Sequence, residues 1–142
     1  MSVSGVFIVL LYLVYMAEII CLDWGKDKLF GWEPEKSIAV VEAIVEGIDE
    51  GADFPPVAVH RLSENVYCIS PLRETPDGLS DGGHYRAIGH YIRKKPLKCE
   101  LLEGLPPIPK AWEVPIEKIE LVPDSGQYSE HEERFSSYAL KA

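Results

Sequence analysis

The chain has 142 residues, of which 23 are acidic and 14 are basic, so its formal net charge is −9 and its pI is near 4.9. Non-specific binding to nucleic acid depends on neutralising phosphates with Lys and Arg, so this composition disfavours a protein that binds nucleic acid over its whole surface. The length allows one domain with one modest core. We place this domain at residues 23–122, between an apolar N-terminal segment (1–22) and a loosely ordered polar tail (123–142).

The thiols and imidazoles do not form a recognisable metal pattern. Cys21, Cys68 and Cys99 are odd in number, far apart and without CxxC spacing, so neither a disulfide framework nor a zinc cluster is expected. Isolated cysteines are most often small packed apolar side chains, and reduced thiols fit a cytoplasmic protein. His60 and His90 have no second ligand at metal spacing, so we expect no metal site.

The run from Val3 to Leu22 is apolar apart from Ser4 and Glu18. A helix of this length, at about 1.5 Å per residue, spans a thin bilayer, and the two lysines that follow it favour a cytoplasmic domain on a single-pass anchor. No Lys or Arg precedes the run, which sets it apart from a secretory signal. The second interpretation is that translation starts at Met16, which leaves residues 18–22 as a short first strand of a cytoplasmic protein.

Helical periodicity marks residues 33–51, where Pro34 suits the first turn and Gly51 suits the C-terminus. Apolar side chains recur there at three- and four-residue spacing and are expected in the core. The acidic side chains of the opposite face are expected in solvent. The apolar face consists of Ile38, Val41, Val45 and Ile48, and the acidic face of Glu35, Glu42, Glu46, Asp49 and Glu50.

Two short β-rich runs, at 57–60 and 66–69, are separated by turn-like residues and predict a hairpin. The segment 71–80 has the Pro, Asp and Gly content of a surface loop, which could act as a lid.

A second helix is expected at 84–95, because apolar residues share one face and Pro96 ends the hydrogen-bond ladder. A strand is expected at 97–102, and the alternating residues 116–122 predict an edge strand.

Residues 81–86 read Asp-Gly-Gly-His-Tyr-Arg and lead into this second helix. A phosphate needs converging N–H donors and positive potential, which Gly82 and Gly83 supply at a helix N-terminus. Arg86, one turn inside, can add a bidentate contact. Between Gly82 and Cys99 the chain has no acid, so a local anion site is possible despite the net charge. The basic residues of this stretch are Arg86, Arg93, Lys94, Lys95 and Lys98.

Two further residues of the motif can move protons. His84 can donate to a phosphate oxygen or titrate near neutral pH, and Asp81 can cap the helix, act as a base or bind magnesium. The structural alternative is that Asp81 is only a cap, the two glycines form a turn, Tyr85 belongs to the core and Arg86 lies on the surface.

The motif and the order of elements together carry a family resemblance. A helix, a Pro-containing entry to a strand, a hairpin, the stretch Leu79-Ser-Asp-Gly-Gly-His-Tyr-Arg-Ala-Ile-Gly-His-Tyr91 and the strand Lys95-Pro-Leu-Lys-Cys-Glu-Leu101 resemble the ParB/sulfiredoxin superfamily over residues 33–102. The resemblance implies an α+β fold, in which a small mixed sheet packs with two main helices. It also implies nucleotide phosphates at this turn, with ATP, ADP or CTP as ligand and magnesium possible. The expected binding residues are Gly82, Gly83, His84, Tyr85 and Arg86, and the expected catalytic residues are Asp81 and His84.

The motif of this chain differs from the motifs of the known subfamilies, and these differences limit which activities the resemblance implies. Sulfiredoxins attack with a Cys directly after Gly-Gly, where this chain has His84, so reduction of an oxidised cysteine is not expected. Free serine kinases of the fold use the acid of a "DGHHR" motif. When the arginine of that motif is aligned with Arg86, the acid of the motif aligns with Gly82, and Asp81 lies one residue earlier. The second His of the motif aligns with Tyr85. Partition proteins add DNA-binding and dimerisation regions for which this chain has no room.

Three hypotheses follow from the sequence. The first is a protein that binds a nucleotide or a phosphorylated small molecule and transfers or hydrolyses phosphoryl groups. The second is a ParB-like protein associated with nucleic acid, of the partition or nuclease type, supported only by the basic stretch from Arg93 to Lys98. The third is a non-catalytic interaction module tethered to a membrane through residues 3–22.

Overall fold

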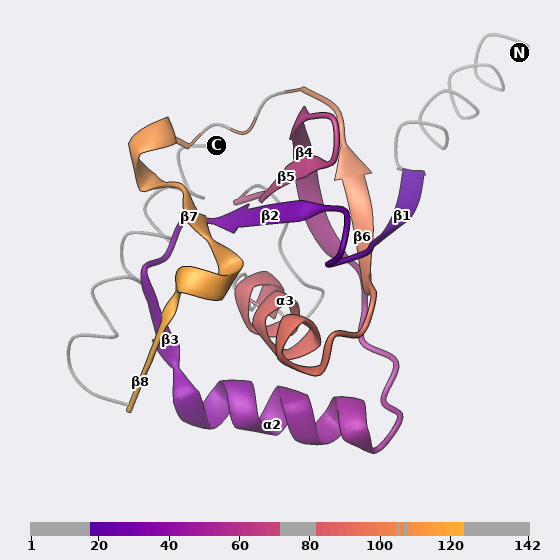
Figure 1. Ribbon diagram of the computed structural model, residues 1–142, viewed down its shortest axis with the longest axis vertical. Helices are drawn as coiled ribbons and strands as arrows, with labels where there is room; N and C mark the ends of the chain where they lie inside the picture. Colours follow the sequence, from indigo (N-terminus) through magenta and orange to yellow (C-terminus); the bar gives the residue numbers. More distant parts are fainter. Residues whose placement is uncertain (1–17, 72–81, 105, 107, 124–142) are drawn as a thin grey trace, which may run out of the picture.

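A computed structural model describes residues 18–71, 82–104, 106 and 108–123. This part of the chain forms a mixed α+β domain with a six-stranded sheet, a second sheet of two strands and two α-helices (Figure 1). The fold class predicted from the sequence, a mixed sheet packed with two main helices, is confirmed.

The strands of the larger sheet lie in the order β1-β6-β4-β5-β2-β7, and β3 pairs with β8 in the smaller sheet. Parallel and antiparallel pairs alternate in the larger sheet: β1–β6, β4–β5 and β2–β7 are antiparallel, whereas β4–β6 and β2–β5 are parallel. The helices are α2 (Ile38–Asp49) and α3 (Gly82–Arg93), with short 3₁₀ helices η1 (Lys110–Trp112) and η2 (Ile116–Lys118). The strands are β1 (Glu18–Leu22), β2 (Lys28–Gly31), β3 (Glu35–Ser37), β4 (Val57–Ser63), β5 (Val66–Ile69), β6 (Leu97–Leu102), β7 (Val114–Pro115) and β8 (Glu120–Val122).

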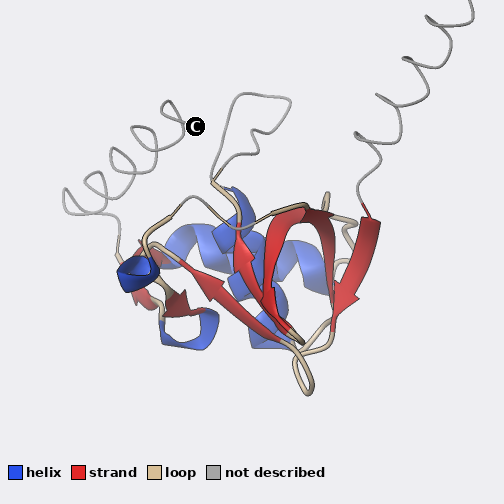
Figure 2. Cartoon of the chain, turned by 90° about the horizontal axis from the view of Figure 1, so that it is seen from above, coloured by secondary structure: helices blue, strands red, loops and turns tan. Residues whose placement is uncertain are grey.

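Helix α3 lies between the larger sheet and α2, with α2 on the outside (Figures 1 and 2). Its buried residues include Ala87 and Ile88, and it contacts β4, β6 and η2. The core therefore forms mainly between one face of the sheet and α3, and α2 covers α3 from the other side.

The end of the apolar N-terminal segment belongs to the sheet. Residues 18–22, which the membrane-anchor hypothesis includes in the apolar run, form β1 and pair with β6, with Ile20 opposite Cys99. This is the short first strand that the alternative interpretation predicts. No helix in the part of the chain that the structure describes is long and apolar enough to cross a membrane. Residues 1–17 lie outside that part.

The predicted helix 33–51 is wrong at its start, because α2 begins at Ile38. The Ser37 side chain accepts a hydrogen bond from the backbone N–H of Val40 at 3.4 Å and caps the helix, whereas the residues before it pair with β8. The end is as predicted: Gly51 has φ +85° and donates its N–H to the carbonyl of Ile48. Val41 is buried as expected, but Ile38 is 39% exposed.

The predicted hairpin and the strand 97–102 are confirmed as β4–β5 and β6. Helix α3 starts and ends two residues before the predicted bounds 84–95. The predicted edge strand 116–122 is wrong in its first half, which forms η2. Ile116 and Ile119 are both buried, and their spacing of three residues matches the period of a 3₁₀ helix rather than of a strand.

The two helices approach closely where Gly89 of α3 meets Ile44 of α2. A Cβ atom at position 89 would lie 2.6 Å from Cγ2 of Ile44 and 3.3 Å from its Cβ. Gly89 is thus the residue that lets α2 pack against α3, although glycine disfavours the interior of a helix.

We therefore expect Gly89→Ala to lower the free energy of unfolding by about 1–3 kcal/mol, because overpacking outweighs a gain of about 0.5–1 kcal/mol in helix propensity. Urea unfolding followed by circular dichroism measures this loss. In an Ile44→Ala background the loss should shrink, since the clashing methyl group is gone. Equal losses in the two backgrounds would contradict the close approach.

Candidate functional site

The first turn of α3 sits directly against two strand ends. A Cβ atom at Gly83 would lie 3.3 Å from Cγ1 of Val57, the first residue of β4, and 3.4 Å from Cγ2 of Ile69, the last residue of β5. The helix therefore starts close to the sheet at this position. Its first turn contains no acidic residue, so no carboxylate of that turn offsets the positive end of the helix dipole.

Arg86 extends from this turn toward the start of β4. Its guanidinium is partly buried, and Nη2 donates to the carbonyl of Pro56 at 3.4 Å. The contact fixes one end of the guanidinium against the backbone that enters β4. Arg86 thus places a permanent positive charge one turn from Gly82 and Gly83.

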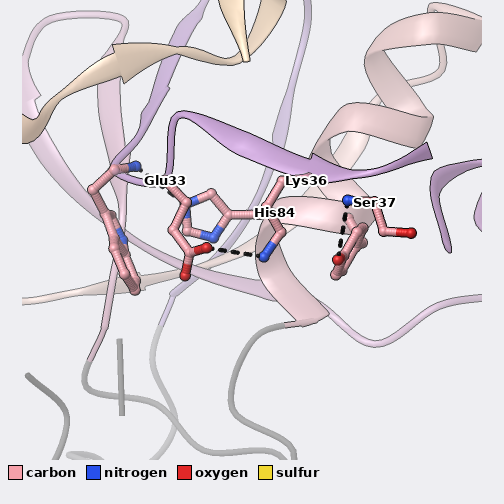
Figure 3. Close-up of polar contacts among 6 residues, drawn as sticks. Glu33, Lys36, Ser37 and His84 are labelled. Carbon is pink, nitrogen blue, oxygen red and sulfur yellow. Dashed lines mark hydrogen bonds and ion pairs between the residues drawn. The ribbon is translucent and has the colours of Figure 1, made fainter. Parts of the chain in front are cut away.

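His84 points into the domain (Figure 3). Its side chain is 1% exposed, and Nε2 accepts a hydrogen bond of 3.1 Å from the backbone N–H of Trp32. The neutral ring therefore carries its proton on Nδ1. The rings of Trp32 and His84 also meet edge to face at 4.8 Å, and the indole N–H of Trp32 donates to the carbonyl of Ile69. These contacts join the segment after β2 to the first turn of α3.

A buried ion pair lies beside His84 (Figure 3). Nζ of Lys36 is 3.2 Å from Oε2 of Glu33, and both side chains are 0% exposed. The same ammonium lies 4.4 Å from the ring centroid of Tyr85, whose hydroxyl accepts from the backbone N–H of Ser37 at 3.4 Å. Since charges are costly to bury unless they are paired, this cluster constrains how the first turn of α3 meets the segment before α2.

Sequence reasoning missed Glu33 and Lys36. On the predicted helix 33–51 both would have occupied an exposed first turn, where a Glu and a Lys three residues apart are common. The available signal was the position of Trp32-Glu-Pro-Glu-Lys36 directly after a short apolar run, which suits an extended segment crossing the core.

The structure thus divides the expected site residues. Gly82, Gly83 and Arg86 lie together at the start of α3, whereas His84 and Tyr85 are buried in the contacts described above. Asp81 and the expected lid at 72–80 lie outside the described residues, so the roles assigned to them stay predictions. No group of three or more potential metal-binding side chains occurs within the described ranges.

The basic stretch from Arg93, the last residue of α3, to Lys98 is largely paired within the domain. Arg93 binds Asp49 with two hydrogen bonds of 2.8 and 2.9 Å, and Lys98 lies 3.0 Å from Asp53. The ammonium of Lys94 lies 3.4 Å from the ring centroid of Tyr91. These contacts reduce the positive surface that the nucleic-acid hypothesis needs.

Two of the three cysteines fit the packed, structural role predicted for them. Cys68 and Cys99 are buried, whereas Cys21 is exposed on β1. Burial raises the pKa of the Cys68 thiol to about 12 and the pKa of Cys99 well above its ordinary value. Neither buried thiol is a thiolate near neutral pH, so neither is suited to nucleophilic attack.

His60 occupies a second buried polar contact, on β4. Its Nδ1 lies 3.2 Å from the carbonyl of Gly104, and its Nε2 lies 2.9 Å from Oγ of Ser70. A carbonyl only accepts, so Nδ1–H donates to Gly104 and Nε2 accepts from the Ser70 hydroxyl. Burial lowers the pKa of His60 below its ordinary value. The imidazole therefore links the ends of β5 and β6 in its neutral form.

Comparisons with protein-family models, with curated proteins and with solved structures find no match to this chain. The resemblance to the ParB/sulfiredoxin superfamily therefore stays a hypothesis that rests on the motif at 81–86 and on the order of elements.

The ion pair can be tested by removing one partner or both. Lys36→Met leaves the Glu33 carboxylate buried without its lysine and is expected to lower the free energy of unfolding by about 3–5 kcal/mol. The double variant Glu33→Gln/Lys36→Met removes both charges and should recover a large part of that loss, as measured by urea unfolding. The single variant Glu33→Gln completes the cycle. A loss in the double variant equal to the sum of the losses in Lys36→Met and Glu33→Gln would contradict a direct interaction between these side chains.

His60 should make the stability depend on pH. Between its lowered pKa in the folded domain and about 6.5 in the unfolded chain, the unfolded state binds more protons. The free energy of unfolding should therefore fall as the pH drops from 7.5 through 6.5, and His60→Gln should reduce this slope. Urea unfolding at a series of pH values measures the effect. The same slope in wild type and variant would contradict the neutral imidazole.

Proposed function

We propose that this chain is a nucleotide- or phosphate-binding protein, with the phosphates at the first turn of α3. The supporting observation is the combination of a first helical turn without an acidic residue, two glycines in that turn and the anchored guanidinium of Arg86. Backbone N–H groups at a helix N-terminus bind phosphate oxygens, and an arginine one turn away adds charge-assisted hydrogen bonds.

In this proposal the residues of the motif have two different roles. Gly82, Gly83 and Arg86 would contact the phosphates. His84 and Tyr85 would hold the turn in place, because both side chains are buried and bonded to residues 32–37. The expected catalytic action of Asp81, with or without magnesium, remains part of the proposal, and so does phosphoryl transfer or nucleotide hydrolysis.

The nucleic-acid hypothesis receives less support. The net charge of −9 opposes it, and Arg93, Lys94 and Lys98 already contact Asp49, Tyr91 and Asp53 within the domain. A protein that neutralised several phosphates would bind nucleic acid with a steep salt dependence. Retention on DNA or RNA that is weak at low salt and insensitive to added salt would remove this alternative.

Titration with ATP, ADP and CTP in the presence of magnesium tests the phosphate site. A nucleotide at a hundredfold excess over its Kd should raise stability by about 2.7 kcal/mol, visible as an increase in Tm. Arg86→Ala should weaken binding about 10- to 100-fold, since a hydrogen bond to a charged group contributes about 1.5–3 kcal/mol.

Arg93→Ala is the matched control, because it removes an arginine of the same helix whose partner is the exposed Asp49. It should leave nucleotide affinity unchanged, and circular dichroism should show both variants folded. Negligible binding by the wild type, or equal affinities of wild type and Arg86→Ala, would overturn the proposed site.

A further inference from the structure

A hollow lies at the C-terminal end of α3, at the other end of this helix from Gly82 and Gly83. One wall is the turn between β1 and β2, and the other is the segment that connects α3 to β6. The hollow has a volume of about 290 Å³, near the lower end of the range for small-molecule sites. It is lined by Asp23, Trp24, Gly25, Lys94 and Pro96.

The two walls are bonded to each other. Nε1 of Trp24 donates to the carbonyl of Lys95 at 2.7 Å and so joins the turn to the segment after α3. The Trp24 ring also meets the Tyr91 ring edge to face at 5.4 Å. Within the turn, the backbone N–H of Asp27 donates to the carbonyl of Asp23 at 2.7 Å. Walls that are already fixed need little ordering when a ligand enters, which lowers the entropic cost of binding.

The backbone of Lys94 has a left-handed conformation, with φ +53°. Its N–H donates to the carbonyl of Tyr91, and the N–H of Lys95 donates to the carbonyl of His90, so these residues close α3 as a Schellman motif. Glycine is the usual residue at this position, because a Cβ atom disfavours positive φ. Lysine therefore brings an ammonium group to the hollow at a cost in backbone strain.

The hollow carries one charge of each sign. Oδ1 of Asp23 accepts a hydrogen bond of 2.9 Å from the N–H of Gly25, which orients the carboxylate. Nζ of Lys94 lies 3.4 Å from the ring centroid of Tyr91. Within the described part of the chain, no ion pair joins Asp23 to Lys94, and neither side chain pairs with another charge.

These two charges and the adjacent rings define the chemistry of a ligand. A simple anion would pair with Lys94 alone and a simple cation with Asp23 alone, whereas a zwitterion pairs with both. The rings of Trp24 and Pro96 add an apolar surface, on which an aromatic side chain can stack.

We propose that this hollow binds a free α-amino acid with an aromatic side chain. Its carboxylate pairs with Lys94, its ammonium pairs with Asp23, and its ring packs on Trp24 and Pro96. This inference does not depend on the proposed phosphate site, which lies at the opposite end of α3.

A series of three ligands on the wild-type full chain tests the proposal without any variant. Heteronuclear NMR should show that L-phenylalanine shifts the indole N–H of Trp24 and the amides of Gly25 and Lys94. Phenethylamine lacks the carboxylate and hydrocinnamate lacks the ammonium. Each should bind about three- to tenfold more weakly than phenylalanine, since an exposed charge pair contributes about 0.2–1 kcal/mol and a charge-assisted hydrogen bond more.

Two variants assign the charges. Lys94→Met should weaken phenylalanine binding and leave the affinity for phenethylamine unchanged, because that ligand has no carboxylate. Asp23→Asn keeps an oxygen for the N–H of Gly25, and it should weaken phenylalanine binding while leaving hydrocinnamate unchanged. Lys110→Met is the matched control, since it removes an exposed lysine outside the hollow, and it should bind phenylalanine like wild type. Circular dichroism should show that all three variants are folded.

Several results would overturn the proposal. The first is a wild type in which millimolar phenylalanine shifts none of the three reporter N–H groups. The second is hydrocinnamate or phenethylamine binding as tightly as phenylalanine, which would assign the hollow to a simple anion or a simple cation. The third is an affinity for phenylalanine that both Lys94→Met and Asp23→Asn leave unchanged.

Discussion

The hydrogen bond from the backbone N–H of Trp32 to Nε2 of His84 is the contact on which the arrangement of this domain depends. It joins the segment after β2 to the first turn of α3, which are 52 residues apart in the chain. The fit is tight, because a Cβ atom at Gly31 would lie 2.7 Å from Cδ2 of the His84 ring. The Glu33–Lys36 pair and the stacking of Lys36 on Tyr85 reinforce the same junction. The position of the α3 N-terminus is therefore set from inside the core.

This junction explains how the turn proposed to bind phosphate is held in place. Helical geometry turns successive side chains by about 100°, so residues 84 and 85 face the core while the helix start and Arg86 remain near the strand ends. A ligand at this turn would meet backbone groups already held in position by buried side chains. Preorganisation of that kind lowers the entropic cost of binding.

The sequence predicted those parts of the fold that local signals control. The β4–β5 hairpin, β6 and the body of both helices follow from periodicity and turn residues, and Gly51 marks the end of α2 as expected. The start of α2 was misplaced because Glu35–Ser37 pairs with β8, a partner 85 residues away that no local pattern reveals. Gly82, Gly83 and Arg86 were named from the sequence and lie at the start of α3, and their binding of phosphate stays a prediction. The inward direction of His84 could not be predicted, since it depends on Trp32.

The pairing of distant strands has a consequence for synthesis of the protein. Glu18 lies opposite Leu101 in the β1–β6 pair, and Lys36 lies opposite Leu121 in the β3–β8 pair. A nascent chain must therefore leave the ribosome almost to the end of the domain before these strands can pair and the ion pair at Lys36 gains its final surroundings. Contacts of such long range make folding slow and leave apolar strands uncovered meanwhile. Until then β1 and β3 lack the strands with which they pair in the folded domain.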